Sequence, residues 1–137
     1  MIVREAPREH FGWLVQRAQC VPSPGFWAIE AVDDAGRIHG MVGYDLATRT
    51  MVQMHVAFDN VAAVRSLLAP GFKEAFSKGR KVVLAAIPED NRASRHLVEH
   101  LGFCAVHTVQ DGWDDGVGLV LYEMRREYCK WLEREAA

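Results

Sequence analysis

The stretch Asn91-Arg-Ala-Ser-Arg-His-Leu-Val-Glu-His-Leu-Gly-Phe103 contains a helix start, an apolar stripe and a helix stop. Asp90 or Asn91 can cap the first turn, because a side-chain oxygen there accepts a free backbone N–H. Gly102 ends the helix, and Phe103 can fold back on the last turn as in a Schellman motif. One side of the predicted helix is apolar and consists of Ala93, Leu97, Val98 and Leu101. The stretch therefore predicts a short amphipathic helix with one buried side.

The chain before this helix predicts a pair of parallel strands. Lys81 to Ile87 is a continuous apolar run, which is typical of a strand covered on both faces. Thr50 to Phe58 is a second long strand-like segment, and Val61 to Ser77 between them has helical apolar spacing. Pro70-Gly71 is expected to kink or split that helix. Strand, helix and strand in this order require a crossover, so the two strands should lie parallel in one sheet.

The remaining segments predict antiparallel strands and two more helices. Asp33 to Arg37 contains a glycine for a tight turn and Thr48-Arg49 makes a second turn, so the strands around them form an antiparallel meander. The expected strands outside the parallel pair are Ile2 to Glu5, Phe26 to Val32, Ile38 to Leu46, Phe103 to Val109 and Val117 to Tyr122, with a polar loop at Gln110 to Gly116. The other expected helices are Arg8 to Ala18 and Glu123 to Glu135. The order β-α-β-β-β-α-β-α-β-β predicts an α/β fold, with one mixed sheet of about six or seven strands and helices on both faces.

Length and composition indicate one globular domain. The chain has 137 residues, of which 50% are hydrophobic and 25% charged, so residues 1–137 are expected to share one core. The formal net charge of -2 gives no strong field that recruits nucleic acid or an anionic membrane. No apolar run reaches the length of a membrane span, and the start has no signal-peptide pattern. Three cysteines without CxxC spacing indicate reduced thiols, so we expect a cytoplasmic protein.

The helix of the opening stretch resembles the second half of a motif of the GCN5-related N-acetyltransferase (GNAT) superfamily, through Asn91, Ser94, Leu97 and Gly102-Phe103. That motif reads Asn-x-x-Ala/Ser, then Leu and Tyr, then Gly-Phe. The predicted element order is similar to the GNAT fold across nearly the whole chain, with one helix missing near the start. The tail from Leu121 to Leu132 is similar to a divergent subset found in phages and prophages. The resemblance implies one GNAT-like domain that transfers an acetyl group from acetyl-CoA directly to a primary amine of an unknown acceptor.

The resemblance also implies where acetyl-CoA binds. In the GNAT fold the fourth and fifth strands splay apart, and backbone groups at the gap favour a ligand that supplies their missing hydrogen bonds. The splay is implied at Val56 to Phe58, opposite Ala85 to Ile87, with a backbone N–H that polarises the thioester carbonyl. The start of the following helix is implied to bind the pyrophosphate through its free N–H groups. The residues implied to contact acetyl-CoA are Val56, Ala57, Phe58, Ala62, Ala63, Arg65, Asn91 and Ser94.

The sequence departs from the family pattern at two positions. The glycine-containing phosphate loop is replaced by Asp59-Asn-Val-Ala-Ala-Val-Arg65, in which Ala62 and Ala63 are the smallest residues. Asp59 there adds a charge that repels phosphate. Val98 stands where the family commonly has a tyrosine that protonates the leaving thiolate. Two hypotheses therefore stay open: an acetyltransferase in which water or the product amine supplies that proton, or a GNAT-fold binding or interaction module without catalysis.

An acetyltransferase of this kind needs a base or a water chain, because an amine with a pKa of about 10.4 must lose a proton before it attacks. His55 and Glu30 are the candidate bases. His55 lies just before the expected splay, and imidazole titrates near neutral pH. The structural alternatives are a sheet histidine that bonds to a neighbour for His55, and a carboxylate that faces the surface for Glu30.

Two other patterns suggest different chemistry. His96-Leu-Val-Glu-His100 matches the H-x-x-E-H pattern of inverzincin metalloproteases. The chain offers little room for a further ligand helix and a substrate cleft, so we expect no metal. Cys104, His107 and Asp111 could form a nucleophile set, but alternation along a strand sends Cys104 and His107 to opposite faces. We therefore expect Cys104 to be a buried structural thiol.

Two apolar features need a partner. Trp113 lies in a glycine-rich polar segment without a core to fill, so it is expected either to contact a second subunit or to rim the acceptor site. The last predicted helix carries Met124, Tyr128, Trp131 and Leu132 and is expected to pack on its own sheet or on a second subunit. A homodimer is therefore one expected partner, beside acetyl-CoA and the amine acceptor, whereas nucleic acid and membrane are not expected.

Overall fold

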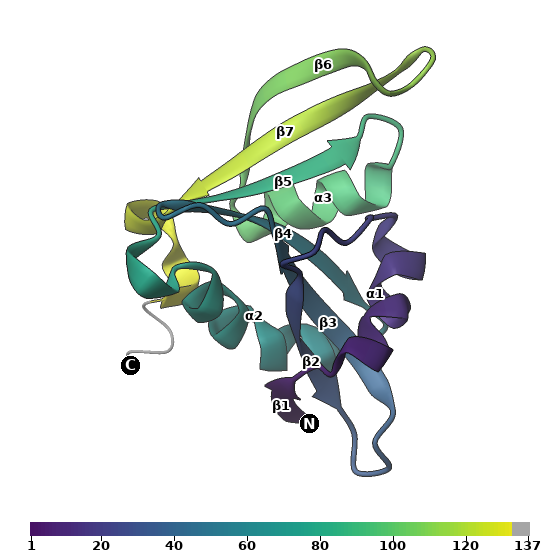
Figure 1. Cartoon of the computed structure of the whole chain (residues 1–137), viewed down its shortest axis with the longest axis vertical. Coiled ribbons are helices and arrows are strands. Elements are labelled where there is room, and N and C mark those ends of the chain that lie inside the picture. Colours follow the sequence, from purple (N-terminus) through teal and green to yellow (C-terminus); the bar gives the residue numbers. More distant parts are fainter. Residues whose placement is uncertain (133–137) are drawn as a thin grey trace.

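The computed structural model describes residues 1–132, and these residues form one seven-stranded mixed sheet (Figure 1). The strand order is β1-β2-β3-β4-β5-β7-β6. Every neighbouring pair is antiparallel except β4 and β5, which are parallel as predicted. The strands are β1 (Ile2–Glu5), β2 (Trp27–Val32), β3 (Ile38–Asp45), β4 (Met51–Phe58), β5 (Val82–Pro88), β6 (Cys104–Asp114) and β7 (Val117–Arg125). The expected element order and fold class are confirmed.

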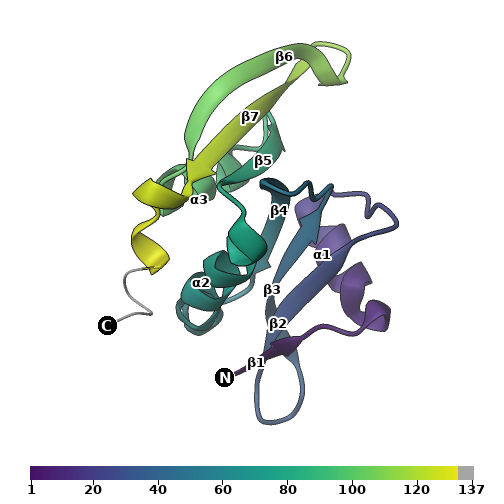
Figure 2. The same ribbon diagram turned by 60° about the vertical axis from the view of Figure 1, so that its left-hand side comes forward.

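Helices cover both faces of the sheet. They are α1 (Phe11–Ala18), α2 (Val61–Ala75) and α3 (Arg92–Leu101), with short 3-10 turns at Arg8–His10, Ser77–Gly79 and Arg126–Tyr128. On one face, Leu14 of α1 lies against Gly43 of β3. On the other face, the Tyr44 hydroxyl donates to the Gly71 carbonyl of α2 at 2.6 Å. Adjacent strand residues point to opposite faces, so α1 and α2 lie on opposite sides of the sheet (Figure 2).

Helix α2 runs through Pro70 as one element, so the expected split at Pro70-Gly71 is wrong. A proline inside a helix costs about 3 kcal/mol, because one backbone hydrogen bond is lost. Burial on both sides of the proline offsets that cost, since Leu67 and Phe72 are fully buried. Packing therefore keeps the crossover between β4 and β5 intact.

Helix α3 has the predicted stop but a different buried side. Gly102 has a φ of 106°, and the Phe103 N–H donates to the Val98 carbonyl at 3.0 Å, which is the Schellman geometry. Val98 is buried, whereas Ala93 is exposed, so the expected stripe is wrong at its first position. The sheet-facing side begins one residue later, at Ser94, and this turns Ser94 toward β4 and β5.

The β6–β7 hairpin is longer than predicted at both ends. β6 continues to Asp114, so most of the expected loop Gln110 to Gly116 is strand. It accommodates polar residues because it is the edge strand and its side chains face solvent. β7 continues to Arg125, so the helix expected from Glu123 does not begin there. The part of that predicted helix beyond Leu132 lies outside the residues that the structure describes.

A register shift in β6 changes which of its residues share a face. The shift lies between Ala105 and His107. Cys104 therefore pairs with Glu123 and His107 with Leu121, two residues apart on β7, so both pairs point to the same face. Both the Cys104 and the His107 side chains are exposed. The expectations of opposite faces and of a buried Cys104 thiol are wrong.

The last described residues pack on the core of their own chain. Trp131 stacks on Phe72 with ring centroids 6.5 Å apart, and its Nε1–H donates to the Leu101 carbonyl at 2.8 Å. Met124 is buried as well, whereas Tyr128 is exposed. Trp131 therefore packs within its own chain, against helices α2 and α3, and not on a second subunit. No helix within residues 1–132 is both long and apolar enough to cross a membrane.

Candidate active site

Strands β4 and β5 pair over only part of their length. Met51, Val52 and Gln53 pair with Val82, Val83 and Leu84, and the pairing then stops. From Met54 and Ala85 onward the strands diverge, and the sheet opens into the halves β1–β4 and β5–β7 (Figure 2). The expected splay is present but begins two positions before Val56. Main-chain groups on the two facing edges are left without a partner in the sheet.

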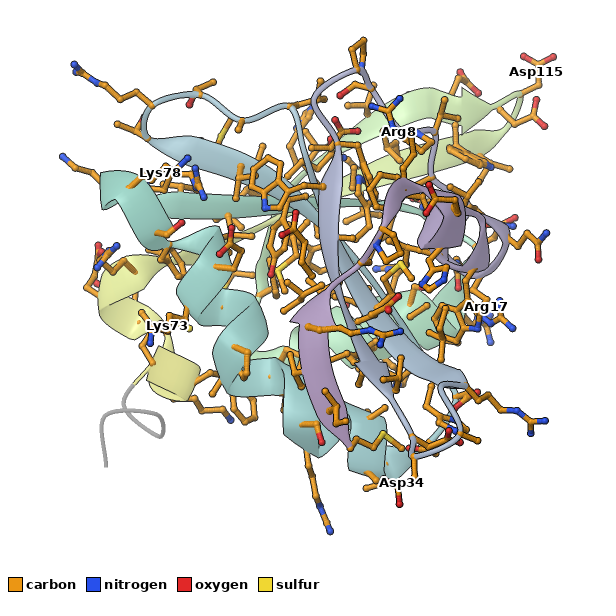
Figure 3. All side chains as sticks on the ribbon, turned by 60° about the horizontal axis from the view of Figure 1, so that its bottom comes forward. Arg8, Arg17, Asp34, Lys73, Lys78 and Asp115 are labelled. Carbon is orange, nitrogen blue, oxygen red and sulfur yellow. The ribbon has the colours of Figure 1, made fainter. Side chains whose placement is uncertain are left out.

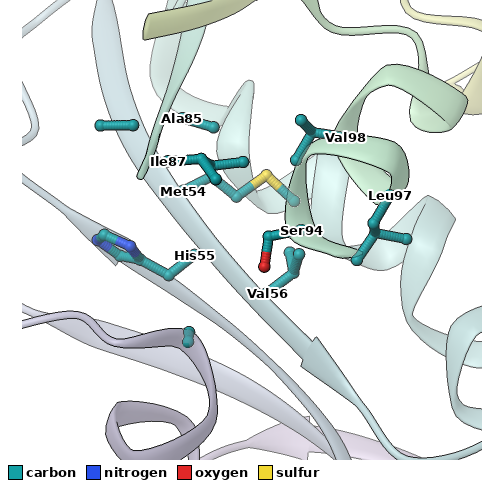
Figure 4. Close-up of a pocket in the computed structure, with 10 residues that line it drawn as sticks. Met54, His55, Val56, Ala85, Ile87, Ser94, Leu97 and Val98 are labelled. Atoms are coloured by element: carbon teal, nitrogen blue, oxygen red, sulfur yellow. The ribbon is translucent and has the colours of Figure 1, made fainter. Parts of the chain in front are cut away.

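The divergence forms a narrow slot between β4, β5 and α3, with a cavity volume of about 40 Å³. Met54 and Val56 point toward α3, whereas the His55 ring points to the other side of β4 (Figure 4). From α3, the Ser94 hydroxyl and the Val98 side chain enter the slot. The α3 side of the slot is apolar apart from Ser94 and the strand edges, so it suits a thin chain of methylene and amide groups.

A second cavity of about 270 Å³ lies on the α1 side of the sheet, and we call it the α1-side cavity. It is enclosed by the segment after α1, the end of β3, strands β4 and β5, and the β6–β7 hairpin. Ala18, His55 and Ala86 line both the slot and this cavity, so the two spaces meet. The other lining residues are Gln19, Cys20, Val21, Ser23, Asp45, Leu46, Gln53, Trp113 and Leu119. A molecule in this cavity can therefore approach one in the slot.

His55 lies where the slot meets the α1-side cavity. Its ring stacks on Phe26 with centroids 6.2 Å apart, and its Nε2 atom is buried without a hydrogen-bond partner among residues 1–132. Burial lowers the pKa of His55, because desolvation disfavours the charged ring, and the carboxylate of Asp45 opposes that shift. The ring is therefore neutral near pH 7 and can exchange a proton with a bound molecule. The alternative of a sheet histidine hydrogen-bonded to a neighbour finds no support at Nε2.

Glu30 lines neither the slot nor the α1-side cavity. Its carboxylate is fully buried, accepts a hydrogen bond from Arg4 Nε at 2.8 Å and contacts His10 Nδ1 at 2.7 Å. The alternative of a surface-facing carboxylate is wrong. Glu30 instead joins β1, β2 and the turn before α1, and the structure does not bring it together with His55.

The three β4 residues expected at the splay lie beyond its start and face different surroundings. Val56 lines the slot. Ala57 packs with the apolar cluster under α1, and Phe58 packs against the main core. Of these three side chains, Val56 alone faces the slot, although the backbone of all three lies along the diverging edge.

The start of α2 is occupied by side chains of the chain itself. The Asn60 carboxamide oxygen accepts the Ala63 N–H at 2.8 Å, and Ala63 is fully buried. Ala62 and Arg65, by contrast, are exposed. The Ala63 N–H expected to bind phosphate is therefore already bonded.

Asp59, just before α2, is paired with His39. His39 donates Nδ1–H to Asp59 at 2.9 Å and Nε2–H to Asp33 at 2.8 Å. Because ionised carboxylates only accept, the ring donates to both of them only when both of its nitrogens carry a proton, that is, in the charged form. These hydrogen bonds to Asp33 and Asp59 raise the pKa of His39. Local sequence patterns carry no signal for the contact between His39 and Asp59, since these residues are 20 positions apart along the chain.

The start of α3 combines a cap with a slot-facing hydroxyl. The Asn91 carboxamide oxygen accepts the Ser94 N–H at 3.1 Å, so the predicted capping role is confirmed. The Asn91 NH₂ group then remains as its donor toward a ligand. The Ser94 hydroxyl points into the slot.

The phenol of Tyr122 lies near the slot, but its hydroxyl is bonded to side chains of α3. The Tyr122 hydroxyl donates to Glu99 Oε2 at 2.6 Å and accepts from Arg95 Nε at 3.0 Å. Burial and the bond to Glu99 raise the pKa of Tyr122, and its hydroxyl proton is held by that carboxylate. Tyr122 therefore does not replace the tyrosine that is absent at Val98.

The H-x-x-E-H pattern does not form a metal centre. His96 and His100 are both exposed on α3. Within residues 1–132, no group of three or more His, Cys, Asp or Glu side chains is placed to hold a metal ion.

Sequence reasoning missed several residues of the α1-side cavity, chiefly Gln19, Asp45 and Gln53. Asp45 ends β3 and Gln53 is the last β4 residue paired with β5. Polar residues where strands end or part were the available signal, and they became informative only once the sheet topology was known.

No protein-family model matches the sequence, and no curated protein matches it significantly. Solved structures do match. The spermidine/spermine N-acetyltransferase of Vibrio cholerae aligns with a TM-score of 0.74 and 10% identity, over 97% of this chain and 95% of that one. The ribosomal-protein-alanine N-acetyltransferase of Brucella melitensis aligns with a TM-score of 0.69 and 20% identity, over 91% of this chain and 99% of that one. The chain has the GNAT fold.

A third GNAT neighbour shows how varied the acceptors on this fold are. The aminoglycoside 6'-N-acetyltransferase of Enterococcus faecium aligns with a TM-score of 0.64 and 15% identity, over 91% of this chain and 97% of that one. The three names share N-acetyl transfer but give a polyamine, a protein alanine and an aminoglycoside as acceptors. These acceptors belong to the neighbours, and the shared fold does not assign any of them to this chain.

Proposed function

We propose that the chain is an N-acetyltransferase that moves the acetyl group of acetyl-CoA directly to a primary amine. The observation that carries this proposal is the slot between β4 and β5, which opens at His55 into a second cavity. The slot offers unpaired main-chain edges to a donor, and the α1-side cavity gives an acceptor access to the same point. Direct transfer requires the donor in the slot and the acceptor in the α1-side cavity to reach the same point.

In this proposal the slot marks where the acyl end of the pantetheine arm of the donor binds. Main-chain groups beyond Gln53 and Leu84 can bond to the amides of the arm, and the Ser94 hydroxyl adds a polar contact. Met54 and Val98 enclose its methylene groups. A backbone N–H of the free β4 edge, within Val56 to Phe58, polarises the thioester carbonyl as negative charge develops on its oxygen.

His55 serves the acceptor in this proposal. The neutral ring accepts a proton from the ammonium group, and the amine then attacks the thioester carbon. A C–N bond forms while the C–S bond breaks. Of the two protons that the ammonium loses, one passes through His55 to solvent and the other goes to the leaving thiolate. Because Val98 cannot donate, that second proton comes from the product amine directly or through water.

Two measurements on the purified protein test the proposal. Calorimetry should show binding of acetyl-CoA, and thiol release from acetyl-CoA should depend on an added primary amine. Absence of heat at millimolar acetyl-CoA contradicts the donor assignment. Binding without thiol release, across protein, aminoglycoside and small-amine acceptors, contradicts catalysis.

A second candidate function, a GNAT-fold binding module without catalysis, is favoured by one observation. At the start of α2, Asn60 already bonds the Ala63 N–H and Asp59 adds a negative charge, and both lower the expected affinity for the phosphates of the donor. The module predicts an intact fold without amine-dependent thiol release. Measurable turnover with any one amine excludes it.

Three finer expectations belong with this proposal: a phage-type origin, a cytoplasmic location and a homodimer. With Trp131 packed on the core of its own chain, the exposed Trp113 and Tyr128 are the aromatic residues that argue for a second subunit. Analytical ultracentrifugation of the whole chain and of Trp113→Ala tests the dimer. A monomer at micromolar concentration removes this partner.

A further inference from the structure

We infer that the α1-side cavity binds a small amine carrying a second positive charge, with the distal cation held between Asp45 and Trp113. The inference rests on the proposed function and names its substrate class. It depends on the charge of Asp45, the placement of Trp113 and the absence of lysine and arginine from the lining residues.

Asp45 is a buried carboxylate without a cationic partner. Its side chain lines the cavity although the residue is only 3% exposed. It accepts hydrogen bonds from the Ser23 hydroxyl, the Ser23 N–H at 3.2 Å and the Leu46 N–H at 2.9 Å. No ion pair found within residues 1–132 includes Asp45. Three neutral donors hold the carboxylate in place but leave its negative charge uncompensated, so a cation that enters the cavity is favoured.

Trp113 reaches the cavity because β6 bulges. The pairing of β6 with β7 is interrupted between Val109 and Asp114, and Asp111 has a φ of 55°. The Asp111 carboxylate accepts the Gly116 N–H at 2.7 Å and so fixes the bend. At Gly112, a Cβ atom would lie 2.8 Å from the Val109 carbonyl oxygen, so the bend requires glycine.

The bend brings an indole face to the cavity. Trp113 is 47% exposed and lines the cavity beside Leu119, so part of the ring remains available to a ligand. An indole ring attracts cations through its π face, and a carboxylate close by adds to that attraction. Asp45 and Trp113 line the same cavity, and in this inference the carboxylate and the indole ring both bind the distal ammonium group. We call this pair of residues the seat.

The charges around this seat exclude acidic acceptors. No lysine or arginine lines the cavity, and residues 104–121 contain none either. The hairpin instead carries Asp111, Asp114 and Asp115, and Figure 3 shows Asp115 pointing outward at its end. An acceptor with a carboxylate would meet only negative charge here. An acceptor with an uncharged distal group would leave the negative charge of the Asp45 carboxylate uncompensated.

The two groups of such an acceptor have separate places. The reacting amine lies toward His55 and Ala86, where the cavity meets the slot, and the distal cation lies at Asp45 and Trp113. A volume of about 270 Å³ holds a small molecule. The predicted acceptor is therefore a compact diamine or a related polycation.

Three amines of equal chain length test this inference: butylamine, 1,4-diaminobutane and 4-aminobutyrate. They differ only in the distal group, which is apolar, cationic or anionic. We expect kcat/KM to be at least about tenfold higher for 1,4-diaminobutane than for butylamine, and lowest for 4-aminobutyrate. Equal values for all three overturn the inference and leave the proposed function standing.

Substitutions at Asp45 and Trp113 test whether these residues bind the distal cation. Asp45→Asn keeps the side-chain shape and should reduce the preference for 1,4-diaminobutane over butylamine to about twofold or less. Trp113→Leu should lower that preference, whereas Trp113→Phe retains a π face and part of it. Asp115→Asn makes the same chemical change outside the cavity and should leave the preference unaltered. An unchanged preference in both Asp45→Asn and Trp113→Leu overturns the inference.

A binding measurement separates this inference from the proposed function. Calorimetry with 1,4-diaminobutane in the absence of acetyl-CoA should give heat that is lost in Asp45→Asn, with thermal melting as the fold control. If that variant does not fold, Trp113→Leu provides the same comparison. Binding of the diamine without acetylation of any amine refutes the proposed function but supports the seat. No binding of the diamine overturns the seat.

Discussion

The two ends of the proposed donor site contrast in how their polar groups are used. Along the slot, the edges of β4 and β5 are unpaired and the Ser94 hydroxyl points into open space. At the start of α2, Asn60 bonds the Ala63 N–H and His39 bonds Asp59. The thioester end is open to a ligand, whereas at the phosphate end, which we call the filled end, the chain itself already bonds the Ala63 N–H. If acetyl-CoA binds as proposed, the contrast predicts that its pantetheine arm contributes more to its affinity than its phosphates do.

The largest effect expected at the open end comes from His55→Gln. Removing a general base typically costs about 100- to 10,000-fold in rate, so kcat should fall within that range while acetyl-CoA binding changes little. Because burial lowers the pKa of His55, the acid limb of the wild-type rate profile should lie below about pH 6.5. Thiol-release kinetics across pH measure both effects.

The control for this change is His107→Gln, which alters an exposed histidine of β6. It should leave kcat and the acid limb in place. A His55→Gln enzyme that keeps more than about half of wild-type kcat would show that water alone serves as the base, and would remove His55 from the mechanism.

Truncating the donor compares the two ends directly. If the phosphates contribute little, kcat/KM for acetyl-pantetheine should lie within about tenfold of the value for acetyl-CoA. The fragment 3',5'-ADP should compete poorly with acetyl-CoA for the same reason. Steady-state kinetics with both donors provide the measurement. A loss greater than about 1,000-fold on truncation would mean that the nucleotide is anchored strongly, at the start of α2 or elsewhere.

The sequence predicted the open end better than the filled end, because the open end follows from local patterns. The strand-helix-strand order gave the parallel pair, and the Gly102-Phe103 stop fixed the length of α3. The family resemblance then located the splay to within two residues. The prediction of the buried side of α3 was wrong at Ala93, because helical spacing alone does not show where the apolar side of a short helix begins.

The filled end depends on contacts between distant parts of the chain. His39 and Asp59 come from different elements and meet only after β3 and β4 pair. Trp113 is a similar case, because its direction is set by a bulge at Asp111 and Gly112 that the polar composition concealed. Residue propensities reflect interactions between neighbours along the chain. The positions of the His39 and Trp113 side chains depend instead on strand register and packing.

Relieving the negative charge at the filled end should have a modest effect. Asp59→Asn removes one exposed charge beside the start of α2, so the KM for acetyl-CoA should fall by about two- to fivefold at low salt. The KM for acetyl-pantetheine should not change, because that donor lacks the nucleotide. The gain should disappear at about 0.5 M salt through screening.

Asp115→Asn supplies the matched control, since Asp115 is exposed at the end of the β6–β7 hairpin. It removes the same charge away from α2 and should leave both KM values unaltered. An equal gain for both donors in Asp59→Asn would point to a change in the slot and would contradict the separation of the two ends.

The smallest predicted effect concerns the stability of the filled end. The bonds to Asp33 and Asp59 raise the pKa of His39, so its stabilising contribution is complete below about pH 6.5 and is lost as pH rises through the raised value. The hydrogen bond from His39 lowers the pKa of Asp33, so that contribution is present above about pH 3.9 and is lost as pH falls through the lowered value. The free energy of unfolding should therefore differ most between wild type and His39→Gln at mildly acidic pH.

Denaturant unfolding of both proteins from about pH 4 to pH 9 measures this difference, with His100→Gln on the exposed side of α3 as the control. The wild-type advantage should shrink toward alkaline pH, because only one ring N–H remains to donate once His39 is neutral. An advantage that grows with pH would mean that the neutral ring is the favoured form. The Asp33-His39-Asp59 arrangement would then be a set of neutral hydrogen bonds, and the electrostatic account of the closed phosphate end would fail.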